Sequence, residues 1–269
     1  MKQFGSKILI IQNARGNPYS GVILSRPLIH SIFPPLKYNT EIIPSAQFKN
    51  CIQGTTTVFQ KTLECLETQP HTLSIGGDHY SSFGTILASL KKYKNQFRLL
   101  WLDAHTDIHS FESSPSKNMH GMVVRMLMTH NYTNIPRLVP RQILYVGVRN
   151  IDPPELKFIK EHKIKMISLQ DFHEKHMESY KTIMQFVKNK PIHISLDVDV
   201  LDPQLMPSTG TPEENGMKLT ELLRLIDQVR ENASNHYATD IMEYNPKIGT
   251  IEEKHQAFQV FYKLVHHIV

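Results

Sequence analysis

The sequence predicts an α/β protein with three layers (α/β/α) and a central, mostly parallel β-sheet. Short apolar runs alternate along the chain with stretches that have helical periodicity. Several of the runs are apolar on both faces, as in a parallel sheet that helices cover on both sides. Clusters of Asp and His follow four of the runs directly, which is where ligands bind in open parallel sheets.

Strands and helices are expected in alternation over the 269 residues. The strands are predicted at 7–12, 71–77, 97–104, 142–148, 165–169, 192–200 and 237–243. The helices are predicted at 46–68, 81–94, 120–131, 153–163, 177–189, 218–232 and 250–269. Prolines in "DPPE" (152–155) suit a first helical turn, and Thr250 with Glu253 fits a capping box. No repeat or linker interrupts the pattern, so a single domain over 1–269 is predicted.

Composition and charge narrow the class of protein. Hydrophobic residues make up 40% and charged residues 20%, as in soluble globular proteins. No apolar run approaches the ~20 residues of a membrane span, and the first residues predict a strand and not a signal peptide. The net charge of +5 and pI of about 9.0 could indicate nucleic-acid binding. However, the basic residues are scattered, so neither a nucleic-acid nor a membrane partner is expected. Cys51 and Cys65 are predicted to be reduced thiols in the cytoplasm.

Acidic residues and histidines gather where the apolar runs end. In "WLDAHTDIH" (101–109), the residues Asp103, His105 and Asp107 alternate, and side chains two apart point the same way on an extended chain. Asp197 and Asp199 repeat this spacing. A second histidine, His79, follows two glycines that allow a tight turn in "GGDH". One such pair is often a strand-end turn or salt bridge, but the joint occurrence at three strand ends favours a metal centre.

The charge of this cluster suggests how many ions it holds. Four buried carboxylates cannot all stay ionised without cations, because desolvation and repulsion would protonate some of them. Two divalent ions would balance the four negative charges. Such ions lie roughly 3.5–4 Å apart, and a water molecule that bridges the two ions would lose a proton and become a nucleophile. Oxygen-rich ligands with some imidazole and no thiolate favour two Mn²⁺ over Zn²⁺ or Cu⁺, with Co²⁺, Ni²⁺ or Fe²⁺ as substitutes.

Five motifs together resemble those of the ureohydrolase family, which includes arginase and agmatinase. They are "GGDHY" (76–80), "DAHTDIH" (103–109), "SLDVDVLDP" (195–203), "STGTP" (208–212) and "DIMEYNP" (240–246). The resemblance covers about residues 71–250 and is strongest to arginases, since the loop "SFESSPSKNMHG" (110–121) has their length. It implies an arginase-like fold and a binuclear manganese hydrolase that cleaves the guanidinium group of L-arginine to L-ornithine and urea through a metal-bridging hydroxide. It also implies a homo-oligomer, a trimer or hexamer.

The resemblance assigns roles to residues of this chain. The implied metal ligands are His79, Asp103, His105, Asp107, Asp197 and Asp199, in agreement with the spacing. Catalytic roles fall to His120, which would protonate the departing amine, to Glu243, which would orient the guanidinium group, and to Asp107, which would steady the hydroxide. The substrate-binding set comprises Ser116, Asn118, Asp152, His109, Ser114, Thr211 and Glu243.

The chain departs from the family pattern near the substrate. Tyr80 stands where the family usually has serine, His109 where arginases usually carry an asparagine, and Ser114 where they carry a threonine. Two alternative functions therefore stay open: hydrolysis of agmatine or another guanidino compound, and, more remotely, a non-catalytic metal-binding or regulatory protein on the same fold. A deacetylase-like amidase is disfavoured by the motifs "DAHTD" and "MEYNP".

Overall fold

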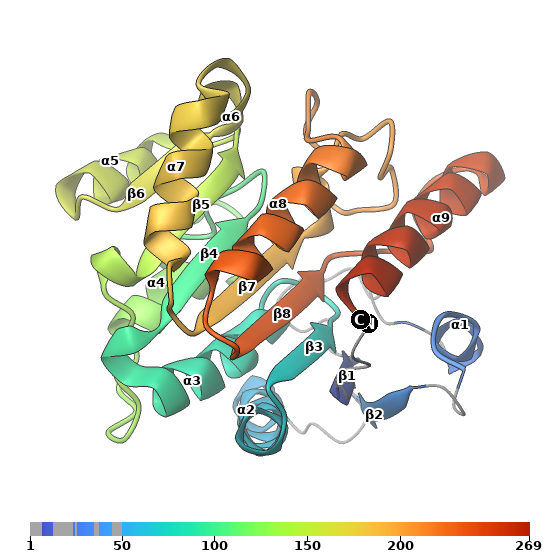
Figure 1. Cartoon of the computed structure of the whole chain (residues 1–269), viewed down its shortest axis with the longest axis horizontal. Coiled ribbons are helices and arrows are strands. Elements are labelled where there is room, and N and C mark those ends of the chain that lie inside the picture. The colour runs from blue at the N-terminus through green and yellow to red at the C-terminus, as the bar shows by residue number, and fades with distance from the viewer. Residues whose placement is uncertain (1–6, 13–23, 25, 35–37, 45–49) are drawn as a thin grey trace.

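Eight parallel strands form one sheet in the computed structural model, which describes residues 7–12, 24, 26–34, 38–44 and 50–269 (Figure 1). The strands are β1 Lys7–Ile11, β2 Asn39–Ile43, β3 His71–Ile75, β4 Arg98–Leu102, β5 Ile143–Val148, β6 Lys165–Ser168, β7 Ile192–Asp197 and β8 Tyr237–Met242. Their order across the sheet is β2-β1-β3-β8-β7-β4-β5-β6, and every pair is parallel. The predicted parallel sheet is confirmed.

Helices cover both faces of this sheet. They are α1 Arg26–Ile32, α2 Cys51–Thr68, α3 Ser81–Tyr93, α4 Val123–Thr129, α5 Pro153–Glu161, α6 Leu169–Glu174, α7 His176–Val187, α8 Leu219–Asn232 and α9 Ile251–Ile268. Side chains of β4 alternate between the faces, as a strand requires. Leu100 and Leu102 pack with α1 and with α6 to α9, whereas Leu99 and Trp101 pack with α3, α4 and α5. The predicted three layers therefore enclose two large apolar cores, one on each face of the sheet.

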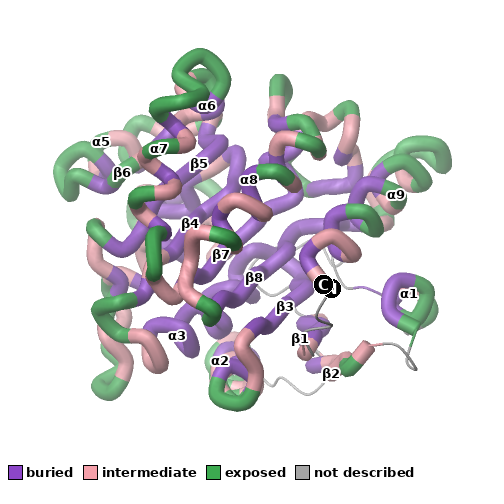
Figure 2. The backbone as a smooth tube through the Cα atoms, in the orientation of Figure 1, coloured by how far each residue is buried: buried purple, intermediate pink, exposed green. Residues whose placement is uncertain are grey.

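The middle of the sheet is the most deeply buried part of the molecule (Figure 2). Every residue of β3, β5, β7 and β8 is buried, whereas the edge strands β2 and β6 carry exposed or half-buried residues. This burial explains why the central strands read as continuous apolar runs in the sequence. No helix in the described part of the chain is long and apolar enough to cross a membrane.

Several predicted boundaries were wrong. β4 ends at Leu102 and β7 at Asp197, so the predictions 97–104 and 192–200 ran into the loops that follow, the second of which opens with a 3-10 turn. The predicted helix 120–131 begins only at Val123, after a 3-10 turn over Met119–Met122. Residues 46–49 of the predicted helix 46–68 lie outside the described residues. Strand β2 and helices α1 and α6 were not predicted.

Candidate metal centre and active site

The strand order brings four polar strand ends together at one edge of the sheet. Strands β3, β8, β7 and β4 are consecutive neighbours and all run the same way. Their carboxyl ends therefore meet. The last residue of β7, Asp197, and the segments that follow the four strands carry all six predicted ligands and Glu243. Residues up to 164 positions apart thereby come into contact, as the hydrogen bond of 2.8 Å from the His79 amide to Glu243 Oε1 illustrates.

The first group of possible metal ligands surrounds His79. Its Nδ1 lies 3.1 Å from Asp103 Oδ2 and 3.2 Å from both Asp107 Oδ2 and Asp197 Oδ2. This nitrogen makes no hydrogen bond of good geometry in the described structure, although it is buried. On the other side of the ring, Nε2 lies 3.0 Å from Ser195 Oγ. A proton on Nε2 leaves a lone pair on Nδ1 that points among three carboxylates, which is the arrangement a cation would satisfy.

The second group adjoins the first and shares Asp103 with it. His105 Nδ1 lies 3.0 Å from Asp199 Oδ2 and 3.5 Å from Asp103 Oδ1. The potential ligand atoms of His79, Asp103 and Asp197 lie within 4.8 Å of one another, and so do those of Asp103, His105 and Asp199. One carboxylate with an oxygen toward each group suits two adjacent cations, as in binuclear hydrolases.

Turns, and not an extended strand, aim these side chains. The chain bends immediately after β4, where the His105 amide donates to Asp103 Oδ1 (2.6 Å), and Asp107 adopts a positive φ of 46°. Asp199 lies in a 3-10 turn, and its backbone amide donates to Asp197 Oδ1 at 2.9 Å. The prediction of an extended strand with alternating side chains was therefore wrong, although the residues chosen on that basis do lie close together. Glu243 also has a positive φ (64°), a conformation that costs energy and is often found at functional sites.

The electrostatics of the cluster favour cation binding. Burial raises the pKa of Asp107 to about 6, and the neighbouring Asp103 adds to the effect. Burial and the charges of Asp199 and Asp103 raise the pKa of Asp197 well above its usual value. Burial alone would lower the pKa of His79, but its carboxylate neighbours outweigh burial and raise it. These carboxylates thus resist ionising together, and the donor set fits two divalent ions that would compensate their charge.

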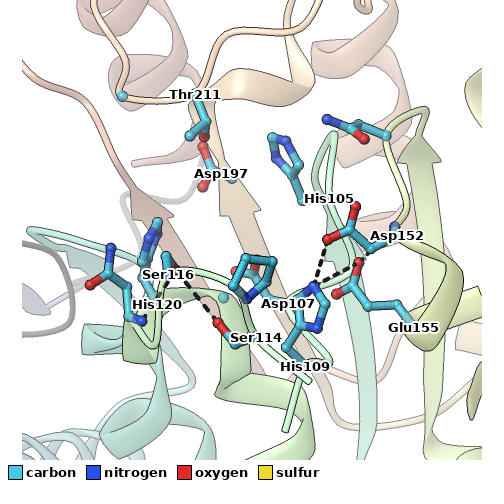
Figure 3. Close-up of a pocket in the computed structure, with 15 residues that line it drawn as sticks. His105, Asp107, His109, Ser114, Ser116, His120, Asp152, Glu155, Asp197 and Thr211 are labelled. Atoms are coloured by element: carbon cyan, nitrogen blue, oxygen red, sulfur yellow. Dashed lines mark hydrogen bonds and ion pairs between the residues drawn. The ribbon is translucent and has the colours of Figure 1, made fainter. Parts of the chain in front are cut away.

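A cavity of about 350 Å³ opens onto this cluster (Figure 3). Three of the predicted ligands, His105, Asp107 and Asp197, line it together with His120. Glu243 is 4% exposed and lies behind His120, with 3.5 Å between its Oε1 and His120 Nδ1. Burial would lower the pKa of His120, but Glu243 outweighs it and raises that pKa.

The predicted substrate-binding residues also lie around this cavity. Six of them line it, namely Ser114, Ser116, Asn118, Asp152, His109 and Thr211. Ser114 Oγ and Ser116 Oγ are 3.5 Å apart, and Thr211 Oγ1 donates to Asp199 Oδ2 at 3.3 Å. His109 Nε2 lies 3.0 Å from Asp152 Oδ2 (Figure 3). The cavity lining includes no Lys or Arg among the described residues.

The sequence prediction missed residues that orient the ligands. Trp101 Nε1 donates to Asp103 Oδ2 at 2.9 Å, and the Trp101 ring stacks on His79 with centroids 4.2 Å apart. Arg149 donates to the carbonyls of Asp199 and Glu213, both at 2.7 Å, and so connects the loop that carries Thr211 to the turn that carries the predicted ligand Asp199. The contacts of Trp101 with His79 and of Arg149 with Asp199 and Glu213 join segments that are distant in sequence, so no local sequence pattern predicts them.

Known proteins share the sequence and the fold of this chain. The arginase family matches residues 37–267. The arginase of Saccharomyces cerevisiae is 34% identical over 219 residues, 73% of this chain and 63% of the relative. The hepatic arginase of Aquarana catesbeiana is 35% identical over 196 residues, 68% of this chain and 60% of the relative. The matches thus span less than two thirds of either relative.

Solved structures agree at the level of the fold. A crystal structure of arginase from Bacillus subtilis superposes with a TM-score of 0.84 at 24% identity. The superposition covers 98% of this chain and 97% of the Bacillus subtilis chain. The arginase of Entamoeba histolytica in complex with L-ornithine gives the same TM-score and identity, with 98% and 99% covered. Because the family match spans most of the described chain, this protein belongs to the arginase family.

Proposed function

We propose that this protein hydrolyses L-arginine to L-ornithine and urea with two Mn²⁺ ions held by six residues, namely His79, Asp103, His105, Asp107, Asp197 and Asp199. The observation that carries the proposal is the pair of adjacent ligand groups sharing Asp103 at the base of a cavity whose described lining residues include no Lys or Arg. A guanidinium cation suits such a cavity. The relatives named as arginases support the choice of reaction.

The proposed chemistry divides between the ions and the protein. Two divalent ions, when bound, would supply a hydroxide at neutral pH to attack the planar guanidinium carbon, which water alone attacks very slowly. Glu243 places a carboxyl group beside the cluster and would orient the guanidinium group. His120 stands at the cavity wall with Glu243 behind it, so its imidazole is held in place and its raised pKa favours the protonated form. It would give its proton to the departing amine.

The outer part of the cavity would hold the amino-acid end of the substrate. Ser116 and Asn118 line it and offer hydrogen-bond donors to a carboxylate. Asp152 offers an anionic acceptor for an α-ammonium group. Thr211 and Ser114 would complete the wall through their hydroxyl groups. Arginine carries both groups, whereas agmatine lacks the carboxylate, so arginine is the proposed substrate.

We further propose a homo-oligomer, a trimer or hexamer, by likeness to the family, and a single domain over 1–269. The free Cys51 and Cys65 support a reducing, cytoplasmic location. Light scattering at micromolar concentration would report a monomer if the oligomer proposal were wrong.

Urea release tests the proposed function. The full chain is incubated with Mn²⁺ and with L-arginine or agmatine, and metal-free protein serves as the control. We expect urea from arginine only when Mn²⁺ is present, with kcat/KM above that for agmatine by orders of magnitude. Equal or faster hydrolysis of agmatine would refute the substrate, and no urea from either compound would refute the reaction.

A further inference from the structure

Two side chains at the rim of the cavity, His109 and Asp152, already contact each other. Nε2 of His109 and Oδ2 of Asp152 are 3.0 Å apart (Figure 3). His109 is 9% exposed, whereas the Asp152 side chain is 48% exposed and turned to the cavity. One carboxylate oxygen of Asp152 is therefore held by the protein itself before any substrate arrives.

This contact does not require a charge on His109. The other ring nitrogen, Nδ1, lies 3.0 Å from Ser113 Oγ, a hydroxyl that can donate to it. The same Ser113 oxygen accepts from the Ser110 amide at 3.0 Å, which fixes its position. A neutral imidazole with its proton on Nε2 thus donates to Asp152 and accepts from Ser113, so both nitrogens are satisfied.

The neighbouring Glu155 is engaged elsewhere and so leaves this part of the rim to Asp152. Its Oε1 accepts from Thr106 Oγ1 at 2.7 Å and from the Ile108 amide at 3.2 Å. Its Oε2 accepts from the Asp152 amide at 3.1 Å and lies 3.7 Å from His109 Nε2. Glu155 is 6% exposed and fixes the backbone of both segments. Among these acids, Asp152 is the one placed to meet a substrate cation.

We propose that His109 is a specificity-determining residue that satisfies Asp152 in place of the substrate's α-ammonium group. The proposal rests on the proposed hydrolysis of arginine and extends its substrate class. A polar site rejects an analogue mainly because its own groups are left unpaired when the analogue lacks a partner. Here Asp152 keeps a partner in either case. The enzyme therefore also accepts guanidino acids that have a carboxylate but no α-ammonium, such as 5-guanidinopentanoate.

Three substrates distinguish recognition of the carboxylate from recognition of the α-ammonium group. L-Arginine carries both groups, 5-guanidinopentanoate lacks the ammonium, and agmatine lacks the carboxylate. With the Mn²⁺-loaded full chain, kcat/KM for arginine should exceed that for 5-guanidinopentanoate by less than about 100-fold, well below the ~10⁴-fold of a site that depends on the missing group.

Variants of His109 then test the cause. His109→Leu removes the donor, so we expect the arginine to 5-guanidinopentanoate ratio to rise about tenfold. His109→Gln, whose amide can donate to Asp152, should return the ratio toward the wild-type value. The arginine to agmatine ratio should stay constant, because it reports the carboxylate. A purely structural role of His109 would change all three substrates alike.

Several outcomes would overturn the proposal. They are a wild-type preference for arginine above about 10³-fold, an unchanged ratio in both variants, or a change in the agmatine ratio instead. If no substrate yields urea, the proposed function fails, and product-like ligands then decide the inference by calorimetry in the presence of Mn²⁺. L-Ornithine and 5-aminopentanoate should bind wild type within about 100-fold of each other. A larger gap, or no binding of either, would contradict the role of His109.

Discussion

His120 occupies a 3-10 turn at the cavity wall, with its Nδ1 3.5 Å from Glu243. If it protonates the departing amine, His120→Asn should reduce kcat for urea release by about 10²–10⁴-fold, a typical contribution of a general acid. Metal content and circular dichroism should not change, because His120 is not among the proposed ligands. The exposed His162 provides the control, and His162→Asn should leave kcat intact. Unchanged turnover in His120→Asn would assign the proton transfer to another group.

Asp103 is the carboxylate common to both ligand groups, so its loss should affect both ions. Asp103→Asn keeps the shape and removes the charge. We expect metal analysis after dialysis to find fewer than two Mn²⁺ per chain, with affinity reduced at least about 100-fold, since even outer contacts of a metal site contribute 10–100-fold. Asp171→Asn, at a half-buried position outside both ligand groups, is the matched control. Two tightly bound ions in Asp103→Asn would exclude a shared ligand.

The individual site residues differed in how far the sequence could predict them. His79, Asp103 and Asp197 were predictable because each lies at or shortly after the end of a strand, and strand ends of a parallel sheet converge. The orienting contacts of Ser195 with His79 and of His109 with Asp152 were not predictable, because they depend on distances between segments that only the folded chain defines. No pattern around Ser195 distinguishes it from other buried serines.

Gly84 lies where helices α2 and α3 approach closely. A Cβ atom at this position would come within 2.9 Å of Val58 and 3.0 Å of the Thr55 carbonyl. Gly84→Ala should therefore push the two helices apart and lower the free energy of unfolding by about 1–3 kcal/mol, despite the better helix propensity of Ala. Urea denaturation measures this loss. Gly121→Ala is the control, because its Cβ would meet nothing within 4 Å. Equal stability of the two variants would show that the interface adapts.

The elements that were not predicted from the sequence are short, and only one side of each is buried. Helix α6 has 6 residues and α1 has 7, too few for a helical period to stand out. Strand β2 ("NTEII") is an edge strand with one exposed end and few apolar residues. The longer α9 was predicted well, and its capping box is confirmed by hydrogen bonds between Thr250 and Glu253 of 2.7 and 3.2 Å.

The stability of the whole chain should depend on pH through His71, at the start of β3. Its ring is buried against Tyr237, and burial, with help from Arg230, lowers the pKa of His71 to about 4. The unfolded chain, with an ordinary pKa near 6.5, then binds more protons between pH 6.5 and 4. The contribution of neutral His71 to the free energy of unfolding is therefore fully present above about pH 6.5. It is lost as the pH is lowered toward 4, and the loss from this residue is at most about 3 kcal/mol.

Urea denaturation of metal-free protein at pH 7 and pH 5 measures this dependence. His71→Gln should reduce the difference in unfolding free energy between the two pH values. His255→Gln, on the exposed side of α9, is the control and should leave the difference unchanged. A wild-type pH dependence that persists in full in His71→Gln would place the titrating group elsewhere.

The parallel sheet as a whole was predictable, because continuous apolar runs alternating with helices leave few other architectures. The strand order was not. Strand β3 lies beside β8, far away in the sequence, and β4 lies beside β7. Such neighbours are chosen by packing across the whole sheet, and the sequence carries no local signal for them. Yet it is this order that places His79 against Asp103 and Asp197.

The proposed binuclear hydrolase is tested most directly by adding Mn²⁺ stepwise to metal-free protein while urea release from L-arginine is followed. Two adjacent ligand groups that share Asp103 predict that the rate rises and reaches its plateau at two ions per chain. A plateau at one ion per chain, or no urea at any Mn²⁺ concentration, would contradict the proposed mechanism.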